Sequence, residues 1–117
     1  MDFTEAEIVH REWKLKLRNA LANRESLDEA IISADNRCSL GQWLHGEAKT
    51  KFSNLISYED CLAKHARFHS CAGNVAKAIN AKKYAEAEAM LAASTEYMFA
   101  SVELLEAISV LKSETES

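Results

Sequence analysis

Apolar residues recur along this chain with the period of an α-helix, and the clearest run lies in the middle. Its positions are spaced 3-4-3-4-3, which places them on one helix face in the heptad geometry of helix bundles. They are Leu62, His65, His69, Ala72, Ala76 and Ile79. We therefore predict a long helix that Ser57 and Asp60 cap at its start and that continues through Ile79.

Two further stripes predict long helices toward the two ends of the chain. Residues 5–24 carry the first stripe, and Thr4 with Glu7 has the three-residue spacing of a capping box. Its members are Ala6, His10, Trp13, Leu17 and Leu21. Residues 84–111 carry the other stripe and are predicted to form one continuous helix. Its members are Ala87, Leu91, Ser94, Met98, Ser101, Leu105 and Ile108.

The connection between the first two long helices contains shorter helical patterns. Residues 38–46 have apolar spacings that suit two turns of helix, and Gly46 is a candidate left-handed terminator. The chain has no proline and only 3 glycines, which disfavours the many tight turns of a β-rich fold. We predict an all-α fold in one domain, residues 1–117: an antiparallel four-helix-type bundle with one or two short extra helices.

Charge and composition then exclude several function classes. A net charge of −4 without a basic run argues against nucleic-acid binding. No apolar run approaches the roughly 20 residues that span a membrane, and the acidic start Met1–Glu5 does not resemble a secretion signal. We therefore expect a cytoplasmic protein without a membrane or nucleic-acid partner. In that reducing compartment, three cysteines indicate thiols or metal ligands rather than a disulfide framework.

The candidate chemistry lies on the apolar stripes. His65 and His69 stand four apart, so one helix face presents two imidazoles, and His10 lies on the dry face of the first helix. A buried imidazole without a partner loses its hydration at a cost in free energy. Cys38 begins a short helix next to Trp43 and Leu44, which would draw it inward.

His10, Cys38, His65 and His69 thus form a complete tetrahedral ligand set for Zn²⁺, which accepts mixed nitrogen and sulfur ligands. Four protein ligands leave no open position for water, so the set favours a structural or sensing site over hydrolysis. The carboxylates of Asp35 and Glu7 are candidate hydrogen-bond acceptors for the ligand imidazoles.

Other interpretations of these residues stay open. The histidines could be core residues satisfied by backbone carbonyls or hydroxyls, without any metal. Cys61, four residues before His65, is a possible substitute ligand, although Cys61 and Cys71 are more simply interpreted as small core residues. His45 sits at a helix end, where the helix dipole favours it, and is left out of the ligand set.

The sequence does not predict an enzyme. It contains no glycine-rich phosphate loop and no nucleophile elbow, and a di-iron bundle would require Glu-x-x-His motifs that are missing. The paired glutamates lie on faces that we assign to solvent: Glu86 with Glu88 and Glu103 with Glu106.

The run Cys38-Ser39-Leu40-Gly41-Gln42-Trp43-Leu44, with His10 upstream and His65-Ala66-Arg67-Phe68-His69 downstream, resembles the chemoreceptor zinc-binding (CZB) family. Members carry a C-x-L-G-x-W core, an upstream histidine and a downstream H-x-x-F-H, and the resemblance covers about residues 10–76. Gln42 and His45 stand where lysine and tyrosine are common in the family, and neither is a ligand position.

The resemblance implies a bacterial, cytoplasmic helical bundle that binds zinc through His10, Cys38, His65 and His69. It also implies a homodimer in signal transduction, either alone or fused to a chemoreceptor or diguanylate cyclase output domain. Oxidants such as hypochlorous acid are proposed to act on the ligand cysteine in the family. We therefore predict a regulatory domain that senses zinc or oxidants. The alternative is a zinc-stabilised dimerisation module without a sensing role.

Overall fold

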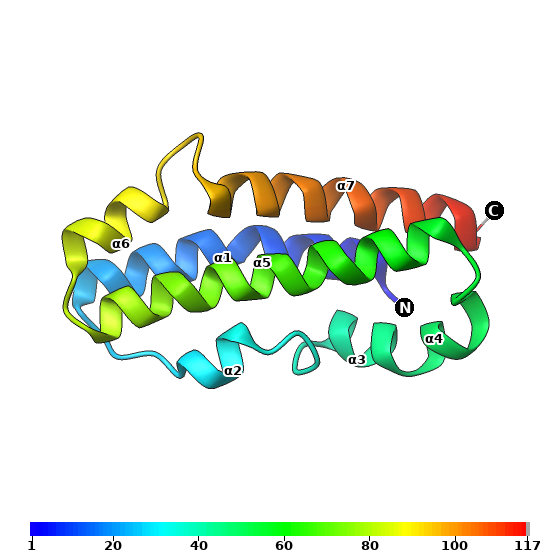
Figure 1. Cartoon of the computed structure of the whole chain (residues 1–117), viewed down its shortest axis with the longest axis horizontal. Coiled ribbons are helices and arrows are strands. Elements are labelled where there is room, and N and C mark those ends of the chain that lie inside the picture. The colour runs from blue at the N-terminus through cyan, green and yellow to red at the C-terminus, as the bar shows by residue number, and fades with distance from the viewer. Residues whose placement is uncertain (117) are drawn as a thin grey trace.

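The computed structural model describes residues 1–116, and these fold into seven helices without a strand (Figure 1). Three helices are long: α1 (Phe3–Asn23), α5 (Ile56–Asn80) and α7 (Glu96–Glu116). They lie side by side along the long axis of a molecule that measures 44 × 25 × 19 Å. This arrangement confirms the predicted all-α bundle.

The fourth side of the bundle consists of short helices in series. α2 (Glu29–Ser33), α3 (Ser39–His45) and α4 (Glu47–Phe52) run along the lower edge of Figure 1 and lead back to the start of α5. With α6 (Tyr84–Met90), the described residues contain four short helices, more than the one or two expected. α1 runs opposite to the series α2–α4, this series runs opposite to α5, and α5 runs opposite to α7. The topology is therefore antiparallel.

The prediction of a single helix over residues 84–111 is wrong, because the helix is interrupted between the end of α6 at Met90 and the start of α7 at Glu96. Ser94 adopts a left-handed backbone with φ of 63°, and the Thr95 hydroxyl accepts a hydrogen bond from the Met98 backbone N–H at 3.3 Å. This hydroxyl therefore caps a new helix start.

The break also changes which face of α7 is buried. The new start resets the helical phase, so the exposed Ser94 and the half-buried Met98, Ser101 and Leu105 do not form the buried stripe. The buried residues of α7 are Tyr97, Ala100, Leu104, Ala107, Ile108 and Leu111.

Three predicted helix ends also differ from the structure. α1 is capped by Asp2, whose carboxylate accepts from the Glu5 backbone N–H at 2.9 Å, so the Thr4–Glu7 capping box is wrong. The earlier start allows Phe3 to pack edge-on against Trp43, with ring centroids 5.3 Å apart.

At the start of α5, the Ser57 hydroxyl donates to the Glu114 carboxylate at 2.6 Å instead of capping the helix. Gly46 does end α3, but its φ is −111°, so it is not left-handed, and α4 begins at the next residue.

The core lies along α5, which faces the rest of the bundle over its whole length. Phe68, Ala72, Val75 and Ala76 of this helix are fully buried. α5 therefore provides a rigid, dry surface on which His65 and His69 are held.

No helix within residues 1–116 is both long and apolar enough to cross a membrane.

Candidate metal centre

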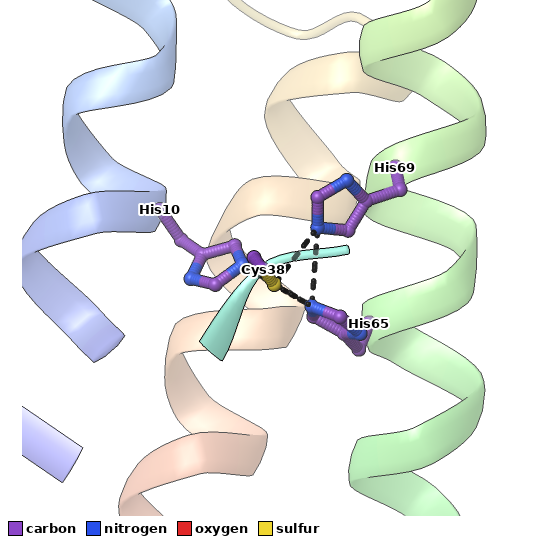
Figure 2. A group of neighbouring side chains, drawn as sticks. All are labelled: His10, Cys38, His65 and His69. Atoms are coloured by element: carbon purple, nitrogen blue, oxygen red, sulfur yellow. Dashed lines mark hydrogen bonds between the residues drawn. The ribbon is translucent and has the colours of Figure 1, made fainter. Parts of the chain in front are cut away.

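Three elements bring the four predicted site residues together (Figure 2). His10 comes from the middle of α1, Cys38 is the N-cap residue of α3, and His65 and His69 lie on successive turns of α5. Their potential ligand atoms all lie within 4.8 Å of one another. The structure therefore brings together the three segments that the sequence pattern predicted to share one site.

The distances within the group match those of a tetrahedral metal site. Cys38 Sγ lies 3.2 Å from His65 Nε2, 3.6 Å from His69 Nε2 and 3.7 Å from His10 Nε2. His65 Nε2 lies 3.1 Å from the Nε2 of His69 and 3.2 Å from that of His10. Ordinary zinc–nitrogen and zinc–sulfur bond lengths would give tetrahedral edges of about 3.4 Å between nitrogens and about 3.6 Å between nitrogen and sulfur. Five of the six donor–donor distances are thus close to those around one zinc ion, and the remaining pair, His10 and His69, lies within 4.8 Å.

Backbone carbonyls orient two of the three imidazoles. His10 Nδ1 donates to the Ala6 carbonyl at 2.7 Å, and His69 Nδ1 donates to the Ile32 carbonyl at 2.9 Å. With the proton held on Nδ1, each ring presents an Nε2 lone pair to the centre, as a metal ligand must. These carbonyls take the role expected of Asp35 and Glu7, whereas the sequence analysis considered carbonyl partners only for histidines without a metal. Only the folded chain shows this, since every residue carries a carbonyl.

His65 is positioned differently from the other two histidines. Its Nδ1 is buried and has no hydrogen-bond partner among the described residues 1–116, so packing holds the ring. His65 and His69 approach each other with ring centroids 4.5 Å apart. Three nitrogen donors and one sulfur donor therefore lie around one centre, an arrangement that a bound cation would stabilise.

Burial sets the protonation of the donors. It lowers the pKa of His10 to about 4, with the hydrogen bond to Ala6 acting in the opposite direction, and it also lowers the pKa values of His65 and His69. The imidazoles are therefore neutral at pH 7 and ready to act as ligands. Burial raises the pKa of the Cys38 thiol, while the Gly41 backbone N–H lowers it. A bound divalent cation would reverse this preference and favour the thiolate.

Gly41 allows the Cys38 segment to approach α5. A Cβ atom at this position would overlap the backbone carbonyl of Asp35 and would lie 3.1 Å from His65 Cε1. The Gly41 N–H also donates to Cys38 Sγ at 3.4 Å. Sequence reasoning gave Gly41 no role of its own, although it is part of the motif that carried the family resemblance.

Gly41→Ala is accordingly expected to destabilise the chain by about 3 kcal/mol, because the added methyl group must displace backbone rather than a flexible side chain. The shift would also move Cys38 and weaken zinc binding at least about tenfold. Urea unfolding and a competitive zinc titration measure the two effects. Ser39→Ala is the matched control, since Ser39 is an exposed helical neighbour. Equal behaviour of the two variants would contradict the close-approach explanation.

The remaining candidate residues lie outside the group. Cys61 and Cys71 are buried and free, and neither belongs to the cluster of potential ligands in the described residues. His45 is the last residue of α3, as predicted, and its Nε2 lies 3.0 Å from the Asp35 carboxylate. Asp35 therefore pairs with His45, although its charge also favours protonation of His69.

Comparison with known proteins agrees with this geometry. The family model of the chemoreceptor zinc-binding domain matches residues 10–76, which is more than half of the chain and contains all four residues of the cluster. Comparison with curated proteins and with solved structures gives no significant match. The family is a regulatory one whose members bind zinc and are not defined by a catalytic activity. The chain belongs to the chemoreceptor zinc-binding domain family, with zinc as its cofactor.

Proposed function

We propose that His10, Cys38, His65 and His69 together hold one zinc ion and that the chain acts as one cytoplasmic regulatory domain that responds to zinc or to oxidants. The matched donor distances and the neutral imidazoles support this ligand set. When bound, zinc supplies a positive charge that keeps Cys38 as a thiolate and a link between α1, α3 and α5.

The observation that carries the sensing role is the position of Cys38. It is the N-cap of α3, a helix of 7 residues, and it is the one donor that is only partly buried. Its sulfur accepts the Gly41 N–H and thus holds the first turn of this helix. A change in the ligation or oxidation of one sulfur atom would therefore reach α3 directly.

Oxidation by hypochlorous acid gives such a change. The Cys38 thiolate attacks the oxygen of HOCl, a sulfur–oxygen bond forms and the oxygen–chlorine bond breaks. The sulfur loses two electrons, chloride leaves, and the proton stays on the oxygen, so that the product is the sulfenic acid. A sulfenic acid is a poorer ligand than a thiolate, so α3 loses its connection to His10, His65 and His69.

The exposed face of α7 supports the proposed homodimer. Phe99, Val102 and Val110 recur on one side of this helix and are 46–54% exposed. Apolar side chains aligned in this way suit a helix–helix contact with a second copy or with a signalling partner. The same face is what favours the second candidate function, a zinc-stabilised dimerisation module without sensing.

Hydrogen exchange tests whether α3 is released when zinc leaves, as the sensing role requires. In a sensor, we expect amides of residues 33–46 to lose protection when zinc is removed, because α3 depends on Cys38 for its first turn. Exchange in the centre of α7, followed by mass spectrometry in the same samples, is the internal control. Protection of residues 33–46 that is equal with and without bound zinc would contradict the release of α3 on which the sensing role depends.

A further inference from the structure

A cavity of about 310 Å³ opens beside Cys38. It lies between the first turns of α1 and the start of α3, and the acidic residues Asp2 and Glu5 are among those that line it. The lining residues on the side of the metal centre are Ala6, Val9, His10, Cys38, Ser39 and Leu40. One wall thus contains two of the four proposed ligands.

The burial of the donors shows from which side the centre can be reached. His65 is 0% exposed, and His10 and His69 are each 2% exposed, whereas Cys38 is only partly buried. On the α5 side, Phe68 is fully buried and its ring packs against both His10 and His69. The side of α1 and α3 is therefore the more open approach to the sulfur.

We propose that this cavity is the entrance through which zinc ions and small thiol-reactive molecules reach Cys38, an inference that builds on the proposed function. A water molecule takes about 30 Å³ of liquid volume, so the cavity has room for a hydrated divalent cation. Two acidic residues, Asp2 and Glu5, are among the nine residues that line the cavity, and their negative charge attracts a cation. Access through this cavity then sets how fast zinc exchanges and how fast the sulfur reacts.

Filling the cavity tests the proposal, because an entrance affects rates without changing the ligands. In Val9→Phe and in Ser39→Phe, a larger side chain is placed in the wall, once from α1 and once from α3. Both zinc release to excess EDTA and alkylation of Cys38 by iodoacetamide in the zinc-free chain are expected to slow about tenfold. Zinc affinity at equilibrium should stay close to that of the unaltered chain, because binding and release slow together.

Gln42→Phe is the matched control, since Gln42 is exposed on α3 and does not line the cavity. Peptide mapping by mass spectrometry reports the alkylation of Cys38 separately from that of Cys61 and Cys71. Unchanged rates in both filled variants would overturn the proposal, and so would an equal slowing in Gln42→Phe. A chain that binds no zinc would overturn the proposed function instead, and alkylation of the zinc-free chain would still test the entrance.

Discussion

Cys38→Ala is expected to lower zinc affinity at least about a hundredfold, since the loss of even a hydrogen-bond partner of a ligand costs 10–100-fold. The variant removes the one sulfur atom that lies within 3.7 Å of all three imidazole Nε2 atoms. The chain purified without added metal should contain about one zinc per molecule, and the variant much less. Mass spectrometry for metal content and a competitive titration measure the difference.

Cys61→Ala and Cys71→Ala are the matched controls. Both remove a buried thiol by the same substitution, and neither thiol belongs to the group of potential ligands. Cys61 lies one helical turn before His65, so it also tests whether another sulfur could take the place of Cys38. Equal zinc loss in the three variants would mean that Cys38 is not the sulfur ligand.

Removal of zinc is expected to lower the melting temperature by about 15 °C. At free zinc a thousand times above its dissociation constant, binding stabilises the folded state by about 4 kcal/mol, and each kcal/mol shifts the Tm of a domain of this size by about 4 °C. The stabilisation has a structural cause, because the ligands join α1, the start of α3 and α5. Differential scanning calorimetry with zinc and after exhaustive chelation measures the shift.

The Cys38→Ala variant provides the control for this measurement. Its Tm should respond little to added zinc or to chelator, whereas Cys71→Ala should respond like the unaltered chain. A melting temperature independent of zinc in all three proteins would contradict the link between the metal and the fold. The histidines would then be core residues satisfied by groups such as the Ala6 and Ile32 carbonyls.

The sequence predicted the fold class, and it predicted the four residues that the structure brings into one group. Helical periodicity is local information, so the stripe around His65 and His69 identified both a buried helix face and two adjacent imidazoles. His10 belongs to the predicted set because an unpartnered imidazole is costly on a dry face, and Cys38 belongs to it because Trp43 and Leu44 lie near the cysteine. The structure brings these four side chains together.

The prediction was weakest where one local signal competes with another. Residues 84–111 have a continuous apolar period, yet the Thr95 hydroxyl and the left-handed Ser94 start a new helix within it. Asp2 takes the cap position in place of Thr4 because the earlier start buries Phe3 against Trp43. Periodicity does not register such interruptions, since they depend on single hydrogen bonds and on contacts with distant residues.

The sequence by itself thus determined an all-α bundle and a zinc-type set of donors, because residue type and helical spacing are written along the chain. Only the tertiary structure decided how the set is held. The Ile32 carbonyl orients His69, and the missing side chain of Gly41 lets the Asp35 backbone and His65 lie close to this glycine. The cavity beside Cys38 forms where the first turns of α1 meet the start of α3. Each of these features joins segments that are separated along the chain, and their distances are fixed only when the helices pack.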